Sequence, residues 1–277
     1  ISQVLPDKPD LIVLPEACDR PPNFNMEQRL AYYRVRGEQI LEFFQEIARN
    51  NNCYLAYSAA REVEDGTWRN STRLIDRKGE ATGTYNKNHL VIEETTEGGI
   101  LCGKEAPIFE TDFGRVACAI CFDLNFEELR LKYVAAKPDL LLFSSMYHGG
   151  AVRTFWAYTC RTHLVGAIAG LQSYIISPVG DEIATTTNYF DFFTKTLNLD
   201  CKLIHLDHNW EKITQLKKKY GPGVIITDPG YLGAVLVTNE MEGVEVQDLL
   251  NEFGIEDLDS YFDRSLAHRH APGNMEP

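Results

Sequence analysis

The sequence is poor in positive charge. Of its 277 residues, 27 are Lys or Arg and 40 are Asp or Glu, so the formal net charge is -13. Proteins that bind nucleic acids hold the phosphate backbone with clustered Lys and Arg side chains, and no basic segment here offsets the excess of acid. The composition therefore predicts no nucleic-acid partner.

Long apolar runs are also absent. No uninterrupted stretch approaches the roughly 20 apolar residues that span a bilayer. The first ten residues, ISQVLPDKPD, lack the basic flank and apolar core of a secretory signal. We therefore expect no membrane partner and a cytoplasmic location.

Cysteine and histidine do not occur in metal-binding patterns. The cysteines are odd in number and none is paired at metal-ligand spacing, so free thiols are predicted at positions 18, 53, 102, 118, 121, 160 and 201. The closest histidines lie in HLDH at 205–208 and in HRH at 268–270, which do not form a zinc pattern. The glycine-rich stretches 149–155 and 221–230 lack the context of a phosphate-binding loop, so no metal and no cofactor is expected.

The chain does contain short apolar runs that alternate with segments of helical spacing. LIVLPE at 11–16 predicts a buried strand, and 26–50 predicts a long helix that stops at the Asn run. Alternating β-rich and turn-rich stretches at 53–87 predict a meander. Residues 115–145 have the strand, helix, strand order of a βαβ unit. The pattern is typical of a layered α/β fold.

The acidic residues are concentrated at the C-terminal end. From Glu240 onward there are ten Asp or Glu residues and two Arg residues. No repeat, low-complexity run or flexible linker separates 11 from 239. We therefore predict one domain at 1–240, followed by an acidic helical extension at 241–277 that packs on the domain or on a partner subunit.

Cys121 has the position of a nucleophile. It ends an apolar strand immediately before a turn into a helix, where ligands gather in open α/β sheets. Free N–H groups and the positive end of the helix dipole at such a junction are expected to lower the thiol pKa and to hold an oxyanion. A cysteine at the end of an apolar strand is more often a buried core residue, as Cys118 is here, so Cys121 requires partners.

Glu16 and Lys87 are candidate partners, because each also closes a β-like run. A carboxylate beside a thiol can take its proton, and an ammonium can stabilise a developing oxyanion, so the three groups form an acid-base site without histidine. Taken singly, Glu16 is better explained as a solvated carboxylate at the end of a strand, and Lys87 as an ordinary surface lysine.

Three segments carry a resemblance to a known family. They are LIVLPE at 11–16, GTYNKNHL at 83–90 and CAICFDLNFEELR at 118–130, and their order along the chain is the family's order. Over roughly residues 5–240 the sequence resembles the nitrilase superfamily of carbon-nitrogen hydrolases, in its amidase and carbamoylase-like branch. The resemblance implies a four-layer α-β-β-α sandwich of two mixed sheets, with the family's first strand missing from this chain.

The resemblance also implies roles and an assembly. Cys121 is expected to be the nucleophile and Glu16 the general base, while Lys87 and the Phe122 amide stabilise the oxyanion. Family members form dimers, so we expect a homodimer or higher homo-oligomer, with the helices after Phe126 and around Phe155 at the interface.

Further site residues follow from the same resemblance. A second glutamate is expected between the lysine and Gly103, and Glu97 is chosen over Glu93 and Glu94 by its spacing from that glycine. Tyr147 and His148 fall in a loop that shapes the substrate pocket in the family, and His148 in particular is equally compatible with a surface position.

The implied function is hydrolysis of a small-molecule amide or N-carbamoyl compound through a cysteine thioester. The Phe-Asp pair after Cys121 favours amides over nitriles, which in this family more often go with Trp-Glu. Nitrile hydrolysis or acyl transfer at the same site, and a non-catalytic scaffold that keeps the fold, remain as alternatives.

Overall fold

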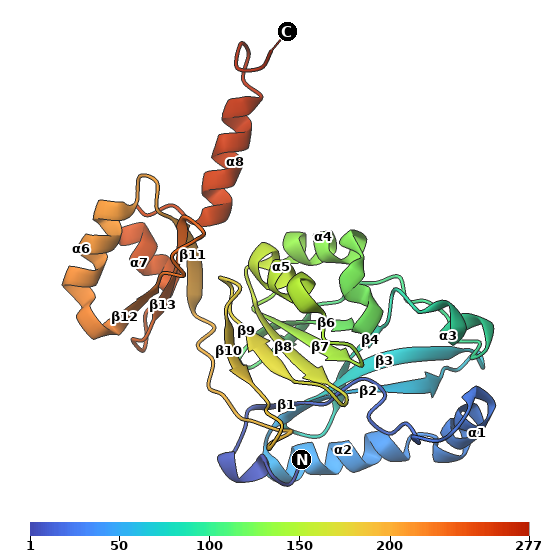
Figure 1. The fold of residues 1–277 in the computed structure, drawn as a ribbon. Coiled ribbons are helices and arrows are strands. Elements are labelled where there is room, and N and C mark those ends of the chain that lie inside the picture. Colours follow the sequence, from blue (N-terminus) through green and yellow to red (C-terminus); the bar gives the residue numbers. More distant parts are fainter. Residues whose placement is uncertain (277) are drawn as a thin grey trace. The chain divides into compact units, whose positions relative to one another are not determined.

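The chain divides into two compact units. The computed structural model describes residues 1–276, and its units are Ile1–Lys195 and Thr196–Pro277 (Figure 1). The division lies about 45 residues before the boundary expected after residue 240. The boundary lies earlier because strands before residue 240 and a helix after it share one hydrophobic core.

The first sheet of Ile1–Lys195 begins with a short parallel pair and continues as a meander. Its strands, in spatial order, are β1 (Leu11–Val13), β2 (Tyr54–Glu62), β3 (Trp68–Ile75) and β4 (Ala81–Asn86). β1 runs parallel to β2, and the pairs β2/β3 and β3/β4 are antiparallel. The predicted strand near residue 11 and the meander at 53–87 are confirmed.

The second sheet is mixed and has six strands. In spatial order they are β10 (Glu182–Thr185), β9 (Tyr174–Ile176), β8 (His163–Ile168), β7 (Leu140–Ser145), β6 (Gly114–Ile120) and β5 (Phe109–Thr111). The pairs β6/β7 and β7/β8 are parallel, with Ile120 opposite Ser144. Strand β6, helix α4 (Glu127–Ala136) and strand β7 form the predicted βαβ unit.

The two sheets pack face to face between two layers of helices (Figure 1). Helices α1 (Met26–Arg36) and α2 (Gln39–Asn51) contact β2, while α4 and α5 (Gly150–Cys160) contact each other and α5 contacts β8. Strand β3 contacts β6 across the interior. This arrangement confirms the expected four-layer α-β-β-α sandwich.

One helix was expected over 26–50, but the structure has two. Gly37 ends α1 with a φ of 52°, a backbone conformation that glycine adopts without a steric penalty, and α2 restarts at Gln39. Phe44 and Ala48 of α2 then face the first sheet, where they belong to one buried cluster with Leu55 and Tyr57 of β2. The break allows the apolar face of α2 to follow the sheet independently of α1.

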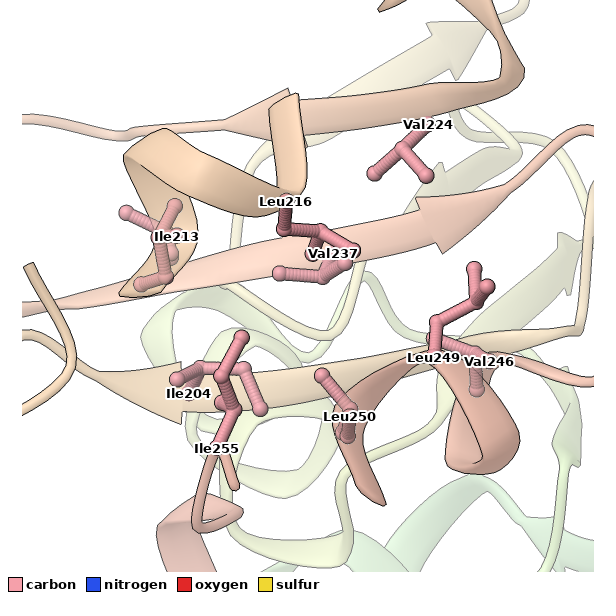
Figure 2. Packing of buried hydrophobic residues seen from close by; sticks show 10 residues of the cluster. Ile204, Ile213, Leu216, Val224, Val237, Val246, Leu249, Leu250 and Ile255 are labelled. Atoms are coloured by element: carbon pink, nitrogen blue, oxygen red, sulfur yellow. The ribbon is translucent and has the colours of Figure 1, made fainter. Parts of the chain in front are cut away.

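The second unit has its own core. Its antiparallel sheet has the order β11 (Cys201–His205), β13 (Ala234–Asn239), β12 (Val224–Thr227), and its helices are α6 (Trp210–Tyr220), α7 (Val246–Glu252) and α8 (Leu258–Arg269). Figure 2 shows the buried side chains Ile204, Ile213, Leu216, Val224, Val237, Val246, Leu249, Leu250 and Ile255. Because α7 supplies three of them, residues after 240 share a core with strands before 240.

Three short 3-10 turns and one short helix complete the described elements: η1 (Leu5–Asp7), η2 (Cys121–Asn125), η3 (Gly221–Gly223) and α3 (Ile92–Thr96). Within residues 1–276, no helix has the length and apolar character needed to cross a membrane.

A buried histidine predicts how stability depends on pH. His163, at the start of β8, is 5% exposed, and burial lowers its pKa from 6.5 to about 4. Between these values the unfolded chain binds a proton that the folded chain does not. We therefore expect the free energy of unfolding to fall by about 3 kcal/mol from this group as the pH falls through that window, measured by urea denaturation.

The variant His163→Gln should have a flatter dependence of the unfolding free energy on pH. Its matched control is His270→Gln, because His270 is exposed and should leave the wild-type slope unchanged. Equal slopes for wild type and His163→Gln would contradict the prediction.

Candidate active site

Three chemical groups lie at the ends of strands, as predicted. Lys87 follows β4 directly, Cys121 follows β6 as the first residue of η2, and Glu16 lies three residues after β1. The two sheets are tied together at this rim, because the Ser144 hydroxyl at the end of β7 donates a hydrogen bond of 2.8 Å to the Leu14 carbonyl. The end of β1 is thereby held beside the end of β7.

A buried ammonium group lies between two carboxylates. Lys87 Nζ is 2.9 Å from Glu16 Oε1 and 2.8 Å from Glu94 Oε2, and the lysine and Glu16 side chains are only 2% and 5% exposed. Burial alone lowers the pKa of a lysine, but here the two carboxylates outweigh it and the pKa of Lys87 is raised. The group is therefore a permanent cation at neutral pH.

The backbone of Lys87 is held on both sides. Its N–H donates to the Asn70 carbonyl at 2.8 Å, and its carbonyl accepts from the Gly103 N–H at 2.7 Å. A Cβ atom at Gly103 would lie 2.2 Å from the Asn86 carbonyl oxygen, so only glycine fits at this crossing. The ammonium is thus positioned by backbone contacts as well as by its own ion pairs.

Asn70, on β3, links the two carboxylates. Its Nδ2 donates to Glu16 Oε1 at 2.9 Å and to Glu94 Oε1 at 3.0 Å. The Val91 N–H adds a third hydrogen bond to Glu94, 3.1 Å long. Nothing in the local sequence around Asn70 indicated these contacts, because Glu16 lies 54 positions before Asn70 and Glu94 lies 24 positions after it.

The second glutamate at the lysine is Glu94, not Glu97. Glu97 is exposed at the C-terminal end of α3, whereas Glu94 lies one turn earlier and faces Lys87. Glu93 is exposed as well. Spacing from Gly103 favoured Glu97, but the helical turn of α3 directs the side chain of Glu94 toward Lys87. The structure therefore does not bring Glu97 into the cluster.

The backbone at Cys121 is left-handed. Its φ is +47°, which costs a residue with a Cβ roughly 1–2 kcal/mol, and strained backbone of this kind recurs at active sites. Ala17, directly after Glu16, has a φ of +49°. Sharp turns therefore follow β1 and β6, at the points where the strands present Glu16 and Cys121.

The surroundings of Cys121 raise its thiol pKa, contrary to the expectation that the helix start would lower it. Burial has the largest effect and the negative charge of Glu16 adds to it, while Lys87 and hydrogen bonds with the Met146 N–H and the Ser145 hydroxyl act in the other direction. The resting thiol is thus protonated at neutral pH. A base is needed before it can attack.

Asp123 connects the cysteine turn to the lysine segment. This fully buried carboxylate accepts hydrogen bonds from Ile120 N–H at 2.9 Å, Tyr85 Oη at 2.6 Å and His89 N–H at 2.8 Å. The His89 ring lies 3.0 Å from it through Nδ1 and stacks on Phe126, with centroids 4.0 Å apart. Sequence reasoning did not identify this role, although Asp123 and His89 lie two residues from Cys121 and Lys87 respectively.

The remaining candidates are placed as follows. Phe122 is half-buried, with its ring edge-on to Phe126, and its amide belongs to the first turn of η2. The Tyr147 hydroxyl is buried and interacts with the Asn125 side chain. Burial and the neighbouring Cys121 raise its pKa to about 12. The His148 ring packs against the Tyr174 ring, and burial lowers the pKa of His148.

Residues 1–276 contain no group of three or more His, Cys, Asp or Glu side chains arranged to hold a metal ion. The charged groups that do converge are two carboxylates and one ammonium, which carry a formal charge of -1 together. The arrangement is suited to acid-base and nucleophilic chemistry by the side chains themselves.

The charges around Cys121 predict its reactivity. Removing the negative charge in Glu16→Gln should lower the pKa of the Cys121 thiol, so the midpoint of the pH dependence of Cys121 alkylation by iodoacetamide should move to lower pH. Peptide mass spectrometry of the alkylated Cys121 peptide at a series of pH values measures this midpoint. The matched control is Glu97→Gln, which removes an exposed carboxylate and should leave the midpoint unchanged. A midpoint at higher pH in Glu16→Gln would contradict the effect assigned to the Glu16 charge.

Solved structures share the fold. An amidase mutant from Nesterenkonia sp. AN1 aligns with a TM-score of 0.60 at 17% identity, over 67% of this chain and 78% of that one. Nit3 of Saccharomyces cerevisiae, described as a member of branch 10 of the nitrilase superfamily, aligns with a TM-score of 0.58 at 17% identity, over 67% and 76% of the two chains.

Curated proteins match in sequence. The chain is 25% identical over 185 residues to human deaminated glutathione amidase, covering 60% of this chain and 54% of that protein. It is 25% identical over 184 residues to omega-amidase NIT2 of Danio rerio, covering 63% and 64%. The chain thus spans about half of the human relative's length. The family model for carbon-nitrogen hydrolases matches residues 1–189, more than half of the sequence, and with this match the chain belongs to the carbon-nitrogen hydrolase family of the nitrilase superfamily.

Proposed function

We propose that this protein hydrolyses amide bonds of small molecules through a thioester on Cys121. The observation that carries the proposal is the buried Lys87 ammonium between Glu16 and Glu94, because both Lys87 and Glu16 lie close enough to Cys121 to act on its thiol, Glu16 raising its pKa and Lys87 lowering it. The names of the relatives support amides as the substrate class, since two of them are amidases. In the Nesterenkonia enzyme, acrylamide adds to the active-site cysteine.

The first step is formation of the thioester. Glu16 takes the proton from Cys121 Sγ as the sulfur attacks the amide carbonyl carbon, and the carbonyl π electrons move onto oxygen. Lys87 and the Phe122 N–H stabilise that oxyanion. When the oxyanion collapses, the C–N bond breaks and the amine leaves with the proton from Glu16.

The second step is hydrolysis of the thioester. Glu16, again ionised, takes a proton from water as the water oxygen attacks the thioester carbon. Collapse of this second oxyanion breaks the C–S bond and returns the proton to Cys121, leaving the carboxylic acid product. Lys87 remains charged throughout, because the carboxylates raise its pKa, and so it acts as a fixed positive charge and not as a proton donor.

The raised pKa of Cys121 agrees with this sequence of steps. A protonated thiol keeps the empty site unreactive, and the base acts only when an electrophile is in place. Asp123 and His89 hold the turn that carries Cys121 against the segment that carries Lys87, so the oxyanion-stabilising groups keep their spacing during both steps.

Cys121→Ala should abolish the activity. We expect turnover of any amide that the wild type hydrolyses to fall by more than about 1000-fold, because no other group can form the thioester. Cys102→Ala is the control, since Cys102 is an exposed thiol outside the site. Release of ammonia or amine from a panel of amides, N-carbamoyl amino acids and nitriles, followed by mass spectrometry of the products, measures the effect. Full turnover by Cys121→Ala would exclude the mechanism.

Exchanging each of two glutamates tests which carboxylate assists. Glu94→Gln should lower kcat/KM by about 10-fold to 100-fold, because it removes half of the negative charge that holds Lys87. Glu97→Gln should stay within about twofold of wild type. A larger loss of kcat/KM in Glu97→Gln than in Glu94→Gln would show instead that Glu97 is the second carboxylate of the site.

Homodimer formation stays a prediction. Its support is the exposure of Leu131 on α4 and Phe155 on α5, each 52% exposed on the outer helical layer of Ile1–Lys195. These are the helices that the family resemblance places at an interface.

A further inference from the structure

The hydrogen bonds of Asn70 leave its amide only one orientation. Nδ2 has two hydrogens, and both are donated to carboxylates, one to Glu16 and one to Glu94. Oδ1 lies 3.4 Å from the Ser58 hydroxyl, which donates to it. A flipped amide would direct its oxygen at two carboxylates. Because the side chain is 6% exposed, water cannot readily replace these contacts.

The two carboxylates bonded to Asn70 are not equivalent. Glu94 uses both oxygens: Oε1 accepts from Asn70, and Oε2 accepts from Lys87 and from the Val91 N–H. Glu16 uses one oxygen, since Oε1 accepts from both Asn70 and Lys87. Within residues 1–276, no hydrogen bond reaches Glu16 Oε2.

We propose that Asn70 is a positioning residue that assigns different tasks to the two glutamates. It helps to fix Glu94 in place as the counter-ion of Lys87, with both oxygens occupied, and rotates Glu16 so that Oε2 alone is open to a proton. The inference rests on the proposed function, because the proton in question is that of the Cys121 thiol.

The physical reason lies in the occupancy of Glu16 Oε1. An oxygen that already accepts two charge-assisted or amide hydrogen bonds would lose them on taking a proton, whereas protonation of Oε2 leaves both bonds in place. The neutral acid formed in the first step therefore keeps its position beside Lys87. It can then return the same proton to the leaving amine from the same oxygen.

Without the Asn70 amide, Lys87 would be the only side-chain donor to Glu16. The carboxylate could then turn about its last bond and direct either oxygen at the lysine. A misplacement of about 1 Å at a reacting group can cost about 100-fold in rate. The expected defect is thus in kcat, since Asn70 itself does not contact the substrate in this scheme.

The test is Asn70→Leu, which keeps the side-chain volume and removes the amide. We expect kcat to fall by about 10-fold to 100-fold with KM within about twofold. The acid limb of kcat/KM against pH should move to higher pH, because a hydrogen bond donated to a carboxylate favours its charged form. The thermal midpoint is measured alongside.

The matched control is Asn239→Leu. Asn239 is an equally buried amide, 4% exposed, that donates to Asp200 Oδ2 and to two backbone carbonyls in the second unit. It should lower the thermal midpoint and leave kcat and the pH limb of the folded enzyme unchanged. If Asn70→Leu does not fold, Asn70→Gln keeps the amide but displaces it by one methylene, and it should show the same two shifts to a smaller degree.

The outcomes separate the two proposals. A lower thermal midpoint with unchanged kcat and pH limb in the folded Asn70 variants, or a loss confined to KM, would overturn the positioning role while leaving the thioester mechanism intact. Full activity of Cys121→Ala would overturn the mechanism itself, whatever Asn70 does.

Discussion

The structure of the first unit depends on keeping one buried ammonium ion neutralised. A charge removed from water is tolerated only when it is paired and hydrogen-bonded, and Lys87 meets this condition through Glu16 and Glu94. The partners come from the end of β1 and from α3, and Asn70 on β3 ties them to each other. Strand order, loop path and helix register must all be correct before the three charges can be buried together.

The second constraint is the junction between the sheets. The nucleophile belongs to one sheet and the charged cluster to the other, so the packing of β3 on β6 sets their separation. Two polar contacts fix the rim: the Ser144 hydroxyl on the Leu14 carbonyl, and buried Asp123 on the segment after β4. These two contacts fix the alignment of the two sheets, because apolar packing alone is not directional.

Local pattern predicted the parts of the site that lie in line with strands. Glu16 and Cys121 follow apolar runs and Lys87 follows a β-like run, so strand ends made them candidates, and the order of the three motifs then selected them before any contact was known. Glu94 could not, because a five-residue helix inside a loop decides which carboxylate turns inward. Asn70 looked like any polar residue of a meander, and only the pairing of β3 with its neighbours shows what it contacts.

The fold was likewise predicted where a single element determined it. The meander and the βαβ unit follow from sequence-local signals, whereas the division after Lys195 arises from packing between β11, β13 and α7. The crossing at Gly103 has a broader consequence. Because the chain returns there to Lys87 through a space that admits no side chain, the loop at 88–102 is closed on itself at both ends. The loop thus behaves as a clasp that keeps Glu94 on the lysine that the same loop begins from.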